Sequence, residues 1–560
     1  MRHWFSNIST WLAVFAMTVV IAGVGGTSIA DDAAGVVRIS DFAADPRPIS
    51  VAASDGNDDD ESDFPEMEPQ LYEGQFSERV EFDPNVPHDM APIHWGFGES
   101  LLEVFEKPAK PLACFYEWIT CAEHVEVETP LHDHAEGLQE VPARPALLLE
   151  TNERFLAPGF LEQGIELPTG AVWRPALWVF GQFRTGISYQ DNRAGTNFTE
   201  WSSRLDLFGQ LNLSGTERVL LGLRPLDEQR SASRSFAGYD FHSGEGIEGA
   251  NADIQTLFFE GDFGEIFPNL DCYDCKMLDI GFSVGRQTMS FQQGLLINED
   301  LIDAVTVTRN TLTGNGNLNL RISGVYGWKE INRNNNMHDP DAQLIGLFTE
   351  SDFASTTVNA DVAYVQSQTE FGSVIAFGLS AIQRLHEYHN TYNSSAHVLG
   401  SYAIDGETSA SGNGLLLFNQ FSWTPHHTED LVYINGFWAI DQFTSPARGQ
   451  LAGGPLGQTG ILFSAAGLGQ FGAPLSNQAS DAAGGSIGYQ LFFDDLTQQV
   501  VFEIGGRKDT NNIDAGQYGF GTRYQKALNQ HWIFVLDGFG VKTQGRDWAP
   551  GSRIEFLAKF

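Results

Sequence analysis

The chain has 560 residues and carries 72 acidic against 32 basic residues, which gives a formal net charge of -40. So acidic a chain is unsuited to coating nucleic acid or an anionic membrane surface, and we expect no nucleic-acid partner. Beyond residue 25 the sequence holds no run of 18 apolar residues, which excludes a transmembrane helix from the mature chain. Any membrane-spanning part must then be a β-barrel.

Residues 1–30 have the pattern of a secretory signal peptide. Arg2 precedes an apolar core from Trp11 to Val24, and small residues lead up to Ala30. An uncleaved anchor is the alternative, but the apolar core is short for one. We therefore expect cleavage after residue 30 and a mature chain that lies beyond the inner membrane.

The next part of the chain is dominated by acidic residues. Residues 31–170 contain 31 acidic and 7 basic side chains. The sequence predicts a largely disordered acidic segment over 31–90. Residues 91–170 are predicted to form a small N-terminal extension of unknown role, through which a periplasmic partner could bind.

Four cysteines form two local pairs, and this arrangement suits an oxidising compartment. Cys114 lies near Cys121, and Cys272 lies near Cys275. Two short disulfide loops are the favoured interpretation. A metal site or a redox pair is the alternative, but the spacing matches no structural zinc pattern, so we expect no metal.

From about residue 171 onward, segments of alternating polarity follow one another, separated by turn-rich stretches. In 176–189, for example, Leu177, Phe183 and Ile187 share one face while Arg184 lies on the other. A period of two marks strands rather than helices. The predicted strands are 176–189, 204–213, 218–224, 253–261, 278–287, 302–309, 318–328, 342–349, 356–366, 373–384, 396–404, 414–424, 430–441, 485–493, 499–507, 516–526, 531–542 and 551–560.

The strand lengths are those of a membrane barrel, because a tilted transmembrane strand needs about ten residues. The sequence therefore predicts an all-β fold, a transmembrane antiparallel β-barrel of about 18 strands over residues 171–560. Turn lengths also alternate: 214–217 and 493–498 are short, whereas 225–252 and 442–484 are long. This alternation is typical of short periplasmic turns and long outer loops.

A soluble β-propeller or β-sandwich would alternate as well. The polar faces carry repeated charges, however, which a closed soluble core could not bury unpaired. The chain also ends in Phe560, on a segment that places Ile554 and Phe556 opposite Arg553 and Glu555. Such an ending resembles the C-terminal signal of bacterial outer-membrane proteins, so we expect a barrel surrounded by outer-membrane lipid.

If the apolar faces meet lipid, the polar faces line a lumen in which arginines outnumber carboxylates. The residues predicted to line the pore are Arg184, Arg204, Arg218, Arg224, Arg321, Arg384, Arg507, Arg523, Asp361 and Glu503. A barrel of this size can hold an aqueous channel, and rings of arginine favour anions. The alternative is that these residues pair across strands and merely hold the wall together.

One segment resembles a known family. Cys275 to Arg309 contains Gly285-Arg286-Gln287 followed by Asp303, and it is similar to the segment of alginate export porins in which a strand ends in Gly-Arg-Gln. The resemblance implies an eighteen-strand outer-membrane barrel with an arginine-rich lumen that exports an anionic uronate polysaccharide. Because every second residue of a strand lies on the same face, Arg286 shares the face of the apolar residues before it. It therefore either lies beyond the lipid zone or follows a bulge.

No catalytic or cofactor site is expected. Gly467 to Gly472 matches a dinucleotide fingerprint in letters only, since it lies in a loop-like stretch. A hydrolase or a metal site could in principle use His386, His389, His397, His426 and His427, but no spacing fixes such a geometry. We interpret them as surface histidines.

The sequence thus predicts a passive porin-like channel for anionic solutes or polysaccharide, and not an enzyme. The rival hypothesis is a structural or adhesive outer-membrane barrel that its long loop 442–484 plugs.

Overall fold

The structure is a computed structural model that describes residues 146–560, apart from gaps at 153–154, 156–163, 192–196, 227–236, 248, 271–277, 315, 388–389, 495 and 512–514. The expected signal peptide, the acidic segment, most of the N-terminal extension and all four cysteines lie outside the described residues. Those expectations therefore stay predictions. In the part of the chain that the structure describes, no helix is both long and apolar enough to span a membrane.

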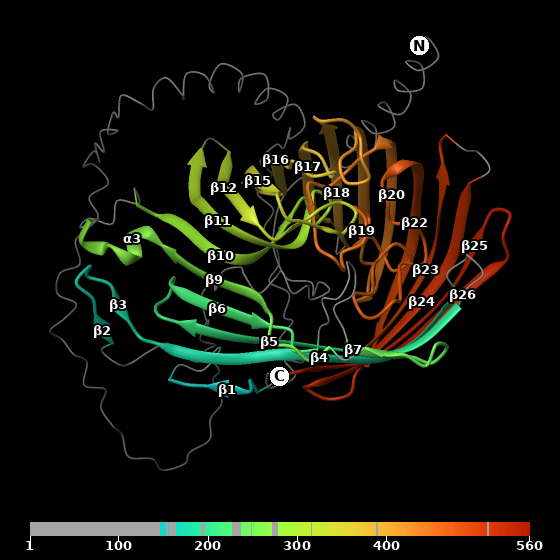
Figure 1. Ribbon diagram of the computed structural model, residues 1–560, viewed down its shortest axis with the longest axis horizontal. Coiled ribbons are helices and arrows are strands. Elements are labelled where there is room, and N and C mark those ends of the chain that lie inside the picture. The colour runs from blue at the N-terminus through green and yellow to red at the C-terminus, as the bar shows by residue number, and fades with distance from the viewer. Residues whose placement is uncertain are drawn as a thin grey trace, which may run out of the picture. The chain divides into compact units, whose positions relative to one another are not determined.

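Eighteen antiparallel strands pair with their neighbours in chain order and close into a barrel (Figure 1). They are β4 (Ala176–Asp191), β5 (Asn197–Asn212), β6 (Arg218–Leu223), β9 (Ile254–Asp262), β10 (Ile280–Phe291), β11 (Ile297–Gly314), β12 (Asn317–Lys329), β15 (Gln343–Asp352), β16 (Thr356–Gln366), β17 (Val374–Glu387), β18 (Asn390–Ala403), β19 (Gly414–Trp423), β20 (Leu431–Gln442), β22 (Ser480–Phe493), β23 (Gln498–Asp509), β24 (Gly516–Ala527), β25 (Trp532–Thr543) and β26 (Trp548–Lys559). Each predicted segment overlaps one of these strands, so the predicted all-β barrel is confirmed.

The other elements of the described residues are short and lie before β4 or in the connections between the barrel strands. They are β1 (Leu149–Glu150), β2 (Ile165–Glu166), β3 (Val172–Trp173), β7 (Ala237–Asp240), β8 (Gly246–Ile247), α3 (Phe263–Ile266), the 3-10 turn η2 (Pro268–Leu270), β13 (Ile331–Asn332), β14 (His338–Asp339) and β21 (Ala447–Arg448).

The barrel closes between its last and first long strands. β26 pairs with β4 over the register Gly551–Gln190 to Lys559–Gln182. Beyond the end of β26, the backbone of Phe560 exchanges two hydrogen bonds with Gly181. Because every long strand has a neighbour on both sides, no long edge is left exposed.

The two ends of the barrel differ in their connections. Because the strands alternate in direction, the short turns 213–217 and 494–497 lie at one end, together with Phe560. The long connections 224–253 and 443–479 lie at the other end, as the sequence predicts. We call these the short-turn end and the long-loop end. One connection departs from the pattern, since 263–279, with α3, lies at the short-turn end.

The outer surface of the barrel is apolar along most strands. On β23, for example, Phe502 and Ile504 are 55% and 63% exposed, whereas Val501 and Glu503, which alternate with them, are buried. Exposed large apolar side chains recur at alternate positions, among them Ile187, Trp201, Leu257, Val284, Val307, Tyr326, Ile345, Leu347, Val362, Phe377, Leu379, Tyr402, Ile434, Ile487, Phe520, Leu536, Ile554 and Phe556. The apolar belt defined by these residues surrounds the barrel.

The interior has two unlike halves. Along β15 to β20 the inward side chains are largely apolar, among them Leu344, Phe348, Leu399 and Leu416, and they are almost fully buried. The expectation that apolar side chains lie on the outer surface is incomplete for these strands, because both of their faces are apolar. On the other half of the wall, which runs from β23 to β26 and across the closure to β4, β5 and β6, the inward side chains are mostly polar or charged.

Three long-loop connections are joined by a buried ion pair. Arg333 and Asp339 are fully buried, with Nη1 of Arg333 2.8 Å from Oδ2 of Asp339. Nη2 of Arg333 also donates to the carbonyl of Gly372 and to the hydroxyl of Ser411. Nearby, hydrogen bonds from Ser373 lower the pKa of the exposed Asp405 carboxyl. The pair thus ties 330–342 to 367–373 and 404–413.

Candidate functional site, an inner loop beside an arginine wall

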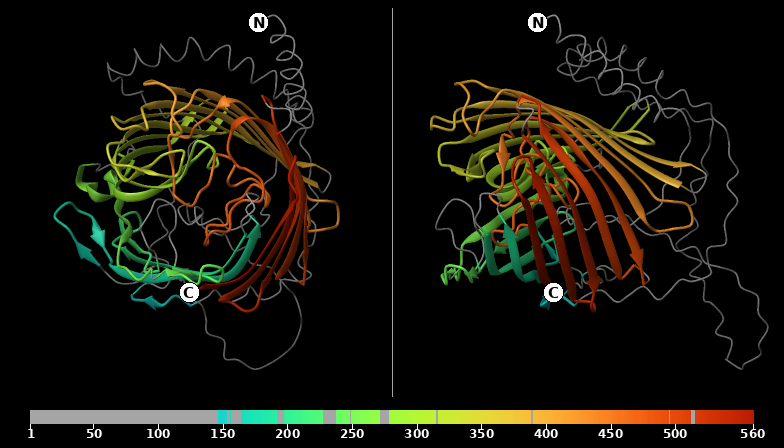
Figure 2. Two further views of the ribbon diagram at one scale, coloured as in Figure 1. Left: turned by 45° about the vertical axis from the view of Figure 1, so that its right-hand side comes forward. Right: turned by 90° about the vertical axis from the view of Figure 1, so that its right-hand side faces the viewer.

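The connection between β20 and β22, residues 443–479, folds into the barrel instead of extending away from it (Figure 2). We call it the inner loop. From residue 449 to residue 480 it contains no charged side chain, and it is rich in glycine, alanine and serine. An uncharged, small-residue loop can lie close to a wall without burying unpaired charges of its own.

Apolar side chains fix one part of the inner loop. Leu456, Leu462 and Phe463 are fully buried. The ring of Phe463 meets Phe437 of β20 edge-on, with 5.6 Å between the ring centroids. The inner loop therefore packs on the apolar half of the interior and shares its core.

The opposite side of the inner loop is held by charged wall residues through its backbone. The carboxylate of Glu503 accepts hydrogen bonds from the backbone amides of Ile461 and Leu462, at 2.7 and 3.1 Å. Nη2 of Arg184 donates to the carbonyl of Ala466 at 3.0 Å. Arg204 Nη1 donates to the next carbonyl along the loop, at 3.2 Å. The two halves of the interior are therefore bridged by the inner loop.

Five arginines and three carboxylates form two neighbouring ion-pair groups on the charged half, and the carbonyl of Gly467 joins the groups by accepting from both Arg184 and Arg204. These residues, the arginine wall, are Arg184, Arg204, Arg224, Arg523 and Arg553 with Asp206, Asp537 and Glu555. Asp537 joins Arg523 and Arg553, at 2.7 and 2.6 Å, because the three stand in register on β24, β25 and β26. The cross-strand pairing expected as the alternative role of these residues is thus present.

The arginine wall is nevertheless asymmetric in exposure. The side chains of Arg184, Arg204, Arg224 and Arg523 keep 13–25% of their surface accessible. Their carboxylate partners Asp206, Asp537 and Glu555 keep only 3–7%. The carboxylates therefore lie behind the guanidinium groups, and water in the lumen meets positive charge.

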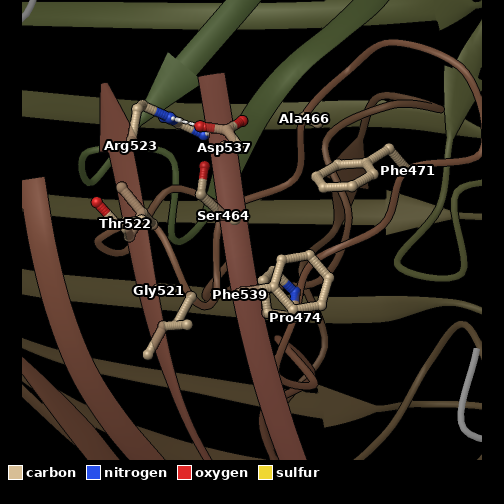
Figure 3. A pocket seen from close by; sticks show the side chains of 12 residues that line it. Ser464, Ala466, Phe471, Pro474, Gly521, Thr522, Arg523, Asp537 and Phe539 are labelled. Carbon is tan, nitrogen blue, oxygen red and sulfur yellow. Dashed lines mark hydrogen bonds and ion pairs between the residues drawn. The ribbon is translucent and has the colours of Figure 1, made fainter. Parts of the chain in front are cut away.

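A pocket opens where the arginine wall meets the inner loop (Figure 3). Arg523 and Asp537 form its charged side, and Phe471 and Phe539 form its aromatic side. The guanidinium of Arg553 lies over the Phe471 ring, 5.3 Å from the centroid. The pocket thus places an ion pair beside aromatic side chains, and Arg553 already covers the face of one of the rings.

The other residues predicted to line the pore lie at different places. Arg507 donates to the carbonyls of Ser476 and Gln478 and so holds the inner loop. Arg218 pairs with Glu260 near the short-turn end. Arg321 pairs with Glu350 at 2.8 Å and remains 47% exposed, and Arg384 is also exposed. Asp361 belongs to the buried polar cluster described below. Of the arginines predicted to line the pore, the structure therefore brings only Arg184, Arg204, Arg224 and Arg523 into the arginine wall.

The motif residues Gly285, Arg286 and Gln287 do not form part of this site. Gln287 points inward and is buried, whereas Arg286 lies on the outer surface near the long-loop end. There Arg286 pairs with Asp303 at 2.8 Å and with Glu330 at 3.1 Å. Gly285 has a φ of 129° and lies so close to the backbone of β9 that a Cβ would clash.

His397 lies inside the barrel and is fully buried, so its interpretation as a surface histidine is wrong. Its two ring nitrogens lie 3.0 and 3.1 Å from the amide oxygens of Gln292 and Gln293. The amide nitrogen of Gln292 also donates to Asp361 at 2.8 Å. This cluster attaches the connection 292–296 to the inner side of β16 and β18. No sequence pattern links these residues, which are far apart in the chain.

We expect Gln292→Leu to lower the free energy of unfolding by about 1–3 kcal/mol, because His397 and Asp361 lose the amide that joins them and stay buried. Urea titration of the refolded barrel, followed by tryptophan fluorescence, measures this change. Gln343→Leu is the control, because Gln343 is exposed at the rim, and it should shift stability by less than about 0.5 kcal/mol. Equal losses in both variants would contradict a structural role for the cluster.

The described residues offer no group of three or more His, Cys, Asp or Glu side chains that could hold a metal. The fold and the site together define a closed eighteen-strand β-barrel, and a loop beside an arginine-rich wall narrows its interior.

No family model and no curated protein matches the chain. Solved structures do resemble it. They include OccK11 (OpdR) of Pseudomonas aeruginosa, with a TM-score of 0.46 and 10% identity, which covers 69% of this chain and 96% of that one. A BenF-like porin from Pseudomonas fluorescens Pf-5 has a TM-score of 0.49 and 8% identity, covering 69% and 98%. OpdK of P. aeruginosa, solved with vanillate, has a TM-score of 0.48 and 11% identity, covering 69% and 98%.

Proposed function

We propose that the protein is a passive outer-membrane channel for small anionic solutes. One observation carries the proposal: the exposed side of the arginine wall is made of guanidinium groups, with their carboxylate partners covered. Cationic side chains along a pore attract anions and raise their local concentration.

The placement in a membrane is supported by the apolar belt. A soluble protein seldom exposes contiguous apolar patches beyond a few hundred Å². Here large apolar side chains are exposed on strand after strand, with tryptophans such as Trp201, Trp328, Trp532 and Trp548 among them. A closed barrel also satisfies its backbone hydrogen bonds internally, as hydrocarbon requires.

The inner loop bears on the size of the solute. It occupies part of the lumen and is held on both sides by buried contacts, which favours small anions over a thick polymer. Export of a uronate polysaccharide, which the resemblance around Arg286 implies, requires a single chain to pass beside the inner loop. The same contacts support the rival function of a plugged structural barrel.

Conductance and reversal potential of the refolded mature protein in a planar bilayer under a salt gradient test these functions. Anion-selective current that is not blocked by oligouronates supports the small-solute channel. Block by oligouronates supports polysaccharide export. Absence of any current supports the plugged barrel and contradicts the channel.

We expect the double change Arg321→Glu and Arg384→Glu to reduce anion preference, because both side chains are exposed on inward positions near the short-turn end. The reversal potential should move toward the cation value. Lys526→Glu is a matched control at the same end, since Lys526 lies on the outer surface of β24. If the reversal potential is unchanged in the double variant, these arginines do not line the conducting path.

A further inference from the structure

Two lysines stand out on the outer surface at the long-loop end. The chain contains only eight lysines. Lys508 lies one residue before the end of β23, and Lys542 one residue before the end of β25, and both share the face of the apolar belt. Among the residues that the structure describes, neither forms an ion pair.

Aromatic rings surround Lys542. In the strand register it stands between Tyr518 of β24 and Trp548 of β26. The two rings meet edge-on across β25, with centroids 5.7 Å apart, and Phe520 joins them. Tyrosine and tryptophan at such positions lie at the headgroup level of a bilayer.

The spacing of the two lysines suits one anionic headgroup. Lys508 stands in register with Gly516, so only β24 separates β23 from β25. Two strand separations and the offset of two residues between Gly516 and Tyr518 place the two Cα atoms about 12 Å apart. The turn 544–547 adds Arg546 and Asp547, both exposed, whose charges offset each other.

We propose that Lys508 and Lys542, together with the Tyr518–Trp548 pair, bind the phosphates of a phosphorylated glycolipid in the outer leaflet. Ammonium groups make charge-assisted hydrogen bonds to phosphate oxygens, and the rings pack against the sugar and upper acyl chains. Charge complementarity selects this partner, because the two lysines are unpaired cations on a strongly acidic chain. The proposal rests on the membrane placement proposed above and not on ion conduction.

The experiment titrates the full mature barrel in neutral detergent with diphosphorylated lipid A and, separately, with the dephosphorylated lipid. Lys508→Gln combined with Lys542→Gln should weaken binding of the diphosphorylated lipid about tenfold, since each basic residue at an anionic surface contributes to binding. Lys526→Gln, at the opposite end of β24, should leave it unchanged.

Four results would overturn the proposal: equal binding by the double variant, an equal loss in Lys526→Gln, equal affinity for the dephosphorylated lipid, or inorganic phosphate binding with the same dependence on the two lysines. Conductance of the double variant, measured in parallel, separates this outcome from a failure of the channel function. A conducting barrel without lipid binding overturns only the lipid site.

Discussion

Removal of the inner loop should increase the single-channel conductance about threefold or more, because an eighteen-strand barrel is wide and the loop narrows it. The structure suggests where to cut. The backbone amide of Gly454 donates to the side chain of Asn477 at 2.9 Å, so residues 455–476 can be replaced by a Gly-Ser pair without moving either end. Anion selectivity should fall as well, because ions in a wider lumen are screened from the arginine wall. Single-channel recording in a planar bilayer measures both effects.

The closing of the barrel does not depend on the inner loop, since β20 and β22 pair directly. The control inserts the same Gly-Ser pair at Gly545, where the surrounding space is open and φ is 76°. It should leave conductance unchanged. If the deletion and the control conduct alike, current does not pass beside the inner loop. Current in the deletion variant alone would favour the plugged barrel.

Arg333→Met should destabilise the long-loop end by about 3–5 kcal/mol, because the change leaves the carboxylate of Asp339 buried without its partner. Gly372 and Ser411 lose their donor in the same step. We expect proteolysis within 330–342 and 404–413 under conditions in which the native barrel resists cleavage. The rate of cleavage at increasing urea concentration gives the free energy of local opening.

Arg321→Met is the matched control, because the Arg321–Glu350 pair has the same separation of 2.8 Å but is 47% and 34% exposed. An exposed pair contributes about 0–1 kcal/mol. Similar cleavage rates in the two variants would show that the buried Arg333–Asp339 pair stabilises the long-loop end no more than an exposed pair does.

The strands could be predicted because the alternation of polarity follows directly from burial on one side. In β4, for example, Gln182, Arg184 and Ser188 face inward while Ile187 faces outward, as the sequence of the strand indicates. No such pattern in the sequence predicts the position of the inner loop. Its lack of charge is readable, but its entry into the lumen depends on contacts with strands far away in the chain.

Two further features could not be predicted from the alternation of polarity, for physical reasons. Along β15 and β17 the inward side meets the inner loop and its neighbours instead of water. The inward positions, such as Leu344 and Phe348, are therefore apolar, as the outward positions are. His397 is buried where Gln292 and Gln293, on a distant connection, lie within hydrogen-bond distance of its two ring nitrogens. Pairing of this kind is a property of three-dimensional packing and not of local sequence.

The polar attachments of the inner loop to the charged wall have a consequence for variation in this chain. Arg184, Arg204, Arg507 and Glu503 all bind the loop through its main-chain carbonyls and amides. Side chains that do not take part in the apolar packing, such as Gln470 and Ser464, can therefore be exchanged while these attachments persist. If the chain is the proposed channel, single substitutions in the loop can change its solute preference while the barrel stays the same.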